Sequence, residues 1–133
     1  LAALGEAWAV AKKSNLDMKK TFQGIKVSSG NSFVHETESQ VILSGSYNIN
    51  FTMDLVEKDM ALFNSLSEKL NIPLEISPLV FTIFKDAHKK YGSRAWSSMV
   101  VKRLEDICKI NFRASGYPEE LVDNEKEEKG YEI

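Results

Sequence analysis

Apolar residues recur every three or four positions along most of the chain, which is the spacing of one face of an α-helix. This spacing predicts clear helices over residues 1–14, 15–29, 52–70, 77–91 and 93–110. Between Gly30 and Gly45 the pattern is shorter and weaker. Asp17 is placed to cap the second helix, and Ser77 followed by Pro78 marks the start of another. No segment alternates apolar and polar residues over a useful length. The sequence therefore predicts an all-α fold, a bundle of about five helices joined by short loops.

The helix predicted for residues 52–70 carries an acid in the middle of its apolar stripe. Asp59 has an apolar residue one turn before it and others one and two turns after it; the stripe consists of Leu55, Phe63, Leu66 and Leu70. Burying a carboxylate is costly unless it is paired, so Asp59 needs a partner. Two interpretations remain open. Asp59 is either a structural acceptor for a helix end or a lysine, or a polar group that holds a catalytic or cofactor site together.

Lys58 lies at the edge of the same stripe, on the row of Phe51 and Leu55. If it is exposed, it would pair with Asp54 one turn earlier, an interaction worth a few tenths of a kcal/mol. At the apolar edge near Phe51 it would instead direct a positive charge into a cleft. The pattern alone favours the first interpretation.

A Ser/Gly-rich loop, VSSGNSF, spans residues 27–33 and leads into the weak helix. Backbone N–H groups of such loops can bind anions. Ser29, Gly30 and Asn31 are therefore candidate ligand-binding residues, although the lysine and the spacing of a P-loop are missing. His35 stands beside Glu36, and the pattern places it on a solvated helix face.

Composition narrows the function classes. The chain of 133 residues is 43% hydrophobic and 27% charged, a balance typical of one soluble globular domain. Its formal net charge of −2 gives no basic field for nucleic acid or an anionic membrane, and its apolar runs are too short to span a bilayer. One cysteine, Cys108, and two histidines provide neither a disulfide framework nor a zinc-binding pattern. These features predict a cytoplasmic protein with no metal site, no nucleic-acid partner and no membrane segment.

The chain resembles one known family in four segments, which occur in the order LAALGEAWAVAKKSNLD, VSSGNSF, FTMDLVEKDMALF and IPLEISPLVFTIFKDAHKKYGSRAWSSMV. Together they look like the C-terminal helical domain of the β-hydroxyacid dehydrogenases. This group includes 3-hydroxyisobutyrate dehydrogenase and 6-phosphogluconate dehydrogenase, and the similarity is closer to the 3-hydroxyisobutyrate type. The resemblance covers residues 1–106. Its most specific part is the Phe-x-x-x-Leu-x-x-Lys-Asp pattern, formed by Phe51, Leu55, Lys58 and Asp59.

The resemblance implies an enzyme that moves a hydride between NAD or NADP and a short 3-hydroxy acid, with a glyoxylate-type or sugar-acid substrate also compatible. In such enzymes an N-terminal Rossmann domain binds most of the cofactor, while the helical domain closes the cleft and forms a homodimer or higher oligomer. The resemblance implies that Phe51 lies near the nicotinamide, that Lys58 faces the cofactor, and that Asp59 supports the site with polar contacts. Hydrogen bonds to the substrate are expected from the loop, at Ser29, Gly30 and Asn31.

Two parts of such an enzyme are missing from the sequence. There is no glycine-rich dinucleotide fingerprint, and the catalytic lysine of the family would fall a few turns before Glu6, upstream of Leu1. Residues 1–110 are therefore expected to form the substrate and dimerisation domain, beginning within the interdomain helix, and residues 111–133 an acidic tail. Alone, this domain is expected to be inactive. The alternative is a non-catalytic helical interaction module on the same scaffold.

Overall fold

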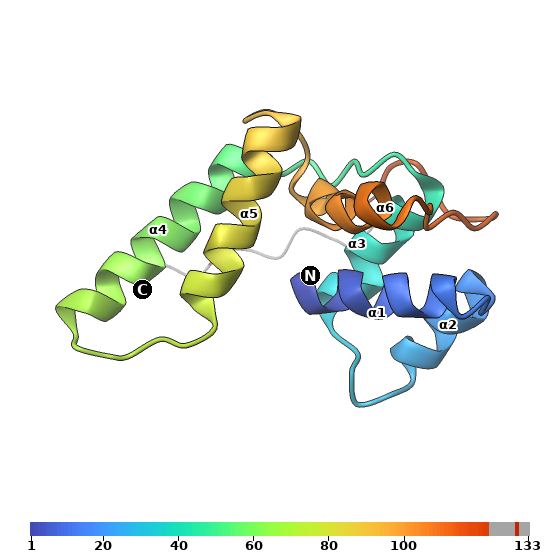
Figure 1. Cartoon of the computed structure of the whole chain (residues 1–133), viewed down its shortest axis with the longest axis horizontal. Helices are drawn as coiled ribbons and strands as arrows, with labels where there is room; N and C mark the ends of the chain where they lie inside the picture. Colours follow the sequence, from blue (N-terminus) through green and yellow to red (C-terminus); the bar gives the residue numbers. More distant parts are fainter. Residues whose placement is uncertain (123–129, 131–133) are drawn as a thin grey trace.

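The computed structural model describes residues 1–122 and residue 130, and within them it is built of helices (Figure 1). The elements are α1 (Ala2–Lys13), α2 (Met18–Lys26), α3 (Phe33–Ser44), α4 (Met53–Lys69), α5 (Ser77–Tyr91), the 3₁₀ helix η1 (Ser97–Val101) and α6 (Lys102–Cys108). In the described part, extended backbone pairs only at an isolated bridge between Thr52 and Trp96. The predicted all-α class is confirmed. None of the described helices is both long enough and apolar enough to cross a membrane.

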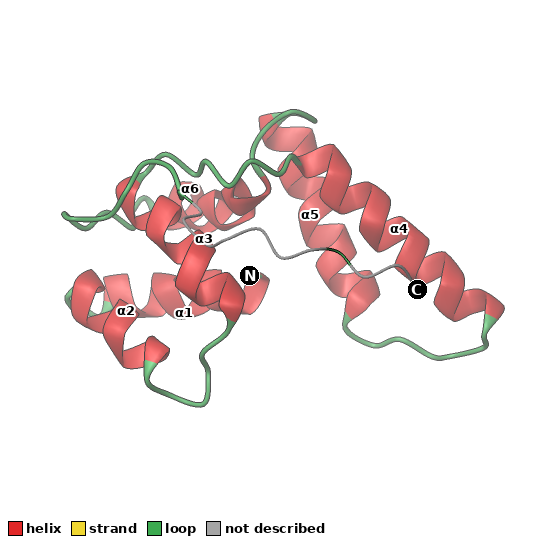
Figure 2. Cartoon of the chain, turned by 180° about the vertical axis from the view of Figure 1, so that it is seen from behind, coloured by secondary structure: helices red, strands yellow, loops and turns green. Residues whose placement is uncertain are grey.

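The helices form two groups that lie side by side (Figures 1 and 2). α4 and α5 run antiparallel as a hairpin joined by residues 70–76, and α4 packs chiefly against α5. The second group contains α1, α2, α3, η1 and α6. The hairpin joins this group where α5 contacts η1 and where the start of α4 meets Trp96. The far end of the hairpin therefore projects away from the main core.

The core lies where α1, α3, η1 and the segment after α6 meet. Its large, fully buried side chains include Trp8, Ile42, Leu43, Met53 and Phe112. The core also extends beyond residue 110, because Phe112 is part of it and the ring of Tyr117 packs edge-on against Phe22, with centroids 5.2 Å apart. The predicted division of the chain at residue 110 stays a prediction. Most of the acidic stretch assigned to the tail lies outside the described residues.

Local sequence signals account for some helix ends. Asp17 is the N-cap of α2 as predicted, and its Oδ1 accepts a hydrogen bond of 2.8 Å from the backbone N–H of Lys20. Gly45 ends α3 with φ at 94°, in the left-handed region that favours glycine. Ser77 followed by Pro78 does mark the start of α5, but Ile76 occupies the N-cap position, so the interpretation of Ser77 as the cap is wrong. Ser77 is the first residue of that helix, and its hydroxyl instead donates to Oδ1 of Asn64 at 2.8 Å.

Asp17→Ala is expected to lower the free energy of unfolding by about 1 kcal/mol, because the N–H of Lys20 loses its partner. Urea denaturation followed by circular dichroism measures the change. Asp17→Asn is the matched control, since asparagine caps a helix about as well as aspartate. Equal destabilisation by both variants would show that the charge, and not the cap, is what matters.

α4 buries a different face from the one that its longest apolar stripe indicates. One side of the helix is buried or partly buried, at Met53, Val56, Met60 and Ser67. Phe63, Leu66 and Leu70 are instead 54–58% exposed, and the side chain of Asp59 is 55% exposed. The prediction that Asp59 lies on a buried face is therefore wrong for this chain. α4 has two apolar faces roughly a quarter of a turn apart, and only one of them meets α5.

Candidate functional site

The start of α4 is held by a loop that comes from far along the chain. The first backbone N–H groups of the helix, those of Met53 and Asp54, donate to the carbonyl groups of Ala95 and Ser93 at 2.8 and 3.1 Å. Free N–H groups at a helix N-terminus attract anions, but these two are already used. Positive charge at this end of α4 therefore has to come from side chains.

Three candidate residues of the sequence lie within the first two turns of α4 or just before it. Phe51 is 36% exposed. Nζ of Lys58 lies 3.0 Å from Oδ1 of Asp59, and the two side chains are 60% and 55% exposed. Lys58 thus pairs with Asp59 and not with Asp54, its expected partner if exposed. Asp59 has a lysine as partner, which is what its structural interpretation expected. An exposed pair of this kind contributes little to stability, so both side chains are available to a ligand.

Arg94 adds a second cation at this end of α4, which the sequence did not indicate. Its Nη1 lies 3.3 Å from Oδ2 of Asp54, and its side chain is 77% exposed. The hydroxyl of Thr52 donates to the same carboxylate. This hydrogen bond, together with the nearby guanidinium of Arg94, holds the pKa of Asp54 below its usual range. Only the pairing of two distant segments brings Arg94 here, so no local signal could have revealed it.

The Ser/Gly loop lies at the opposite end of α3 from the chain that leads into α4 (Figure 1). α3 has 12 residues and so is about 18 Å long. In the loop, Nδ2 of Asn31 donates to Oε1 of Glu36 at 2.7 Å, while its Oδ1 is buried without a protein partner. Hydrogen bonds from Asn31 and Lys26 keep the pKa of Glu36 below its usual range. Ser29 and Gly30 are exposed. The candidate residues therefore form two separate groups.

The prediction that His35 lies on a solvated face is wrong, because its side chain is fully buried. Its Nε2 lies 3.0 Å from the carbonyl of Phe22, and its Nδ1 lies 3.0 Å from the hydroxyl of Ser39. The ring also stacks on Trp8, with centroids 5.9 Å apart. Since both ring nitrogens have protein partners, His35 holds α1, α2 and α3 together and is not a catalytic candidate. His35 and Ser39 are four residues apart and so lie on the same face of α3, which was the signal that sequence reasoning missed.

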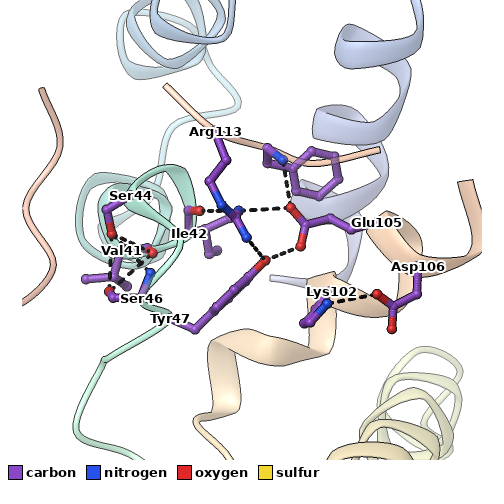
Figure 3. Close-up of polar contacts among 10 residues, drawn as sticks. Val41, Ile42, Ser44, Ser46, Tyr47, Lys102, Glu105, Asp106 and Arg113 are labelled. Atoms are coloured by element: carbon purple, nitrogen blue, oxygen red, sulfur yellow. Dashed lines mark hydrogen bonds and ion pairs between the residues drawn. The ribbon is translucent and has the colours of Figure 1, made fainter. Parts of the chain in front are cut away.

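A buried carboxylate lies outside the candidate site. Figure 3 shows Glu105, Tyr47 and Arg113 pointing toward one another from three parts of the chain. Glu105 is 3% exposed and accepts hydrogen bonds from the Tyr47 hydroxyl, from Nη1 of Arg113 at 3.0 Å and from the N–H of Phe112 at 2.6 Å. Arg113 also donates to the carbonyl of Ile42 at 3.1 Å. These contacts fasten the segment after α6 onto the end of α3.

This network is structural. Burial, followed by the hydrogen bond to Glu105, raises the pKa of Tyr47, which therefore stays protonated as a donor. Three protein groups donate to the carboxylate, and Glu105 is 3% exposed, so a substrate cannot reach it. Within residues 1–122 and 130, no three His, Cys, Asp or Glu side chains gather as a metal ion would require. The start of α4 remains the better candidate site.

Comparison with known proteins decides the family. Residues 1–104 match the family described as NAD-binding of NADP-dependent 3-hydroxyisobutyrate dehydrogenase. The chain belongs to this family. The description of the family names NAD-binding and a dehydrogenase, and the relatives that match are dehydrogenases, so the family that the resemblance implied is confirmed.

Individual relatives agree with the family assignment. L-threonate dehydrogenase of Haemophilus influenzae is 26% identical over 107 residues, which are 80% of this chain and 36% of the relative. 2-(Hydroxymethyl)glutarate dehydrogenase of Eubacterium barkeri is 29% identical over 112 residues, 84% of this chain and 37% of the relative. The crystal structure of 3-hydroxyisobutyrate dehydrogenase from Salmonella typhimurium has the same fold over 77% of this chain and 36% of its own, with a TM-score of 0.71 and 24% identity. The chain thus spans about a third of the length of the relatives it matches.

Proposed function

We propose that this chain is the helical C-terminal part of an NAD- or NADP-dependent 3-hydroxyacid dehydrogenase, where it completes the cleft between nicotinamide and substrate. One observation carries the proposal. Phe51, Lys58 and Asp59 are exposed together at the start of α4, in a chain that matches the family over residues 1–104. We assign the dinucleotide-binding domain and the catalytic lysine to polypeptide upstream of Leu1.

Each exposed side chain suits a part of that cleft. The ring of Phe51 provides an apolar wall that keeps water from the nicotinamide. Lys58 offers a positive charge to a substrate carboxylate or to the cofactor phosphates, and Asp59, 3.0 Å away, orients the ammonium group. Arg94 is a second cation for the same anionic groups. The nicotinamide, when bound, supplies or accepts the hydride.

The substrate that we propose is a short hydroxy acid. The Ser/Gly loop supports this through Asn31, whose Oδ1 has no protein partner. That oxygen is covered in this conformation, so the loop has to open before it can accept a hydrogen bond from a substrate hydroxyl. Ser29 and Gly30 are exposed beside it. This role requires a single cleft that has the Ser/Gly loop at one end of α3 and the start of α4 at the other. The proposed cofactor-binding domain spans the distance between them.

Sequencing the coding DNA upstream of Leu1 tests the proposal. We expect a strand followed by Gly-x-Gly-x-x-Gly and a helix, and then a lysine on the helix that leads into residue 1. The isolated chain should then show no cofactor-dependent turnover of a hydroxy acid. A start codon close to Leu1, or turnover by the chain alone, would contradict the proposal.

A second candidate function is a non-catalytic helical interaction module. The observation that favours it is the exposed apolar surface of the α4–α5 hairpin, where Leu62, Ile76 and Leu79 are 63–72% exposed. An interaction module would lose neither turnover nor cofactor affinity when Lys58 is replaced, which separates it from the enzyme.

The remaining parts of the proposal concern assembly and compartment. We propose that the chain forms a homodimer or a higher homo-oligomer, because large apolar side chains left in water indicate a protein partner. We also propose a cytoplasmic location. The single cysteine, Cys108, supports a reducing compartment because the chain cannot form an internal disulfide.

A further inference from the structure

A polar cavity of about 270 Å³ lies where the turn between α1 and α2 meets the segment that follows α6. It is open to solvent on one side, and its lining includes Lys12 of α1, Met18 and Lys19 of α2, and residues 113–115. A single water molecule needs about 10–15 Å³ of such space, so the cavity has room for a ligand of several non-hydrogen atoms. Figure 1 shows the α1–α2 turn at the end of the molecule away from the α4–α5 hairpin. The proposed function therefore leaves this cavity without a role.

Positive charge dominates the lining of the cavity. Lys12, Lys19 and Arg113 contribute three cations, against the single carboxylate of Asp17. Arg113 is already paired, since its Nη1 lies 3.0 Å from Oε1 of Glu105. The ion pairs of lysines within the described residues involve four other lysines, so Lys12 and Lys19 have no carboxylate partner there. Two uncompensated ammonium groups thus face one cavity in a chain whose formal net charge is −2.

The start of α2 adds backbone donors to the same lining. The N–H groups of Met18 and Lys19, the first two of the helix, have no acceptor among the described residues, while the next two donate to Asp17. Unpaired N–H groups at a helix N-terminus favour a negative charge nearby. The carbonyl groups at the end of α1 would disfavour one, but those of residues 10–12 already accept N–H groups from residues 14–16. Their negative charge is therefore partly compensated.

The walls of the cavity are fixed without a ligand. The segment after α6 is held against α3 by the guanidinium of Arg113 (Figure 3) and by a hydrogen bond of 3.0 Å from the N–H of Ala114 to the carbonyl of Leu43. On the other side, α2 packs against both α1 and α3. Nζ of Lys19 reaches across to the segment after α6, where it lies 3.8 Å from the position that a Cβ atom would have on Gly116. A preformed site of this kind loses little conformational freedom on binding.

We propose that this cavity binds a small dianion, whose charged groups are a phosphate or a pair of carboxylates. The ammonium groups of Lys12 and Lys19 neutralise the ligand, and the first two N–H groups of α2 donate hydrogen bonds to it. The exposed hydroxyl of Ser115, which also lines the cavity, is a further donor. The bound ligand connects α1, α2 and the segment after α6. This inference does not depend on the enzymatic proposal.

Isothermal titration calorimetry of the chain with inorganic phosphate, and separately with succinate, tests the proposal. At low ionic strength, where charges are least screened, we expect at least one of the two to bind at one site per chain with a Kd below about 1 mM. Lys12→Ala and Lys19→Ala should each weaken this binding about tenfold, because each removes a charge-assisted hydrogen bond. Circular dichroism checks that the variants fold, as expected for side chains that reach solvent.

Matched variants separate a site from a general effect of charge. Lys13→Ala and Lys20→Ala remove the same charge from exposed neighbours that do not line the cavity, so they should leave the Kd unchanged. Asp17→Asn removes the carboxylate of the lining but keeps a capping side chain. It should tighten binding roughly three- to tenfold, because a negative charge that repels the ligand is lost.

The two probes also identify the class of ligand. Binding of phosphate alone would support a phosphate ester as the ligand, and binding of succinate alone would support a dicarboxylate. Binding of neither would overturn the proposal. An equal loss of affinity in Lys19→Ala and Lys20→Ala would overturn it as well, since the anion would then respond only to net charge. The upstream coding sequence decides the enzymatic proposal separately, so the two can fail independently.

Discussion

Glu105→Gln is expected to lower the free energy of unfolding by about 3 kcal/mol, the low end of the range for a broken buried ion pair. All three protein groups around the carboxylate donate, namely the Tyr47 hydroxyl, the N–H of Phe112 and the guanidinium of Arg113. An amide has one accepting oxygen, and its NH₂ group would face a donor. The loss stays at the low end because the Arg113 side chain is 37% exposed and water can solvate it. Urea denaturation followed by circular dichroism measures the change.

Two control variants make this expectation specific. Tyr47→Phe removes two hydrogen bonds, the one that its hydroxyl donates to Glu105 and the one that it accepts from Nη2 of Arg113. It leaves the ion pair, so it should cost about 1–2 kcal/mol. Glu75→Gln changes an exposed carboxylate and should cost nothing measurable. A loss of less than about 1 kcal/mol for Glu105→Gln would contradict the assignment of this network as the fastening of the C-terminal segment.

The sequence predicted the helices because their signals are local. Helical spacing, the cap at Asp17 and the left-handed Gly45 each depend on residues a few positions apart. The stripe on α4 shows the limit of this reasoning. Two apolar faces of one helix look alike in sequence, and only the packing partner decides which of them is buried. The face that was expected to be in the core is therefore the one left exposed.

The burial of polar residues could not be predicted from the sequence for a related reason. His35 and Glu105 look like ordinary surface residues until distant segments bring them their partners. The carbonyl group that meets His35 belongs to Phe22, 13 residues earlier, and the hydroxyl that meets Glu105 belongs to Tyr47, 58 residues earlier. Hydrophobic periodicity contains no information on such contacts.

The candidate site was partly predictable for the same reasons. Phe51, Lys58 and Asp59 form a short pattern in the first turns of α4 and just before it, so the sequence locates them together. Arg94 reaches the same end of α4 only because the loop after α5 lies beside the start of that helix. The separation of the Ser/Gly loop from this group is likewise a result of the fold, because α3 stands between them.

Lys58→Ala, made in the polypeptide that includes the proposed cofactor-binding domain, is expected to lower kcat/KM by about 10- to 100-fold. The variant removes a cation that the proposed cleft uses for a carboxylate or a phosphate. Stability should not change, because Lys58 is 60% exposed and its partner is the neighbouring Asp59. Steady-state kinetics, with the cofactor and the hydroxy acid varied in turn, shows which ligand the lysine contacts.

Matched variants separate a site role from a general effect of charge. Lys89→Ala removes an exposed lysine on α5 and should leave the kinetics unchanged. Lys58→Arg keeps the charge but alters its shape, so it should retain more activity than Lys58→Ala if charge is what the ligand needs. Unchanged kinetics in Lys58→Ala would favour the interaction module. The exposed pair of Lys58 and Asp59 would then be surface charge without a role in catalysis.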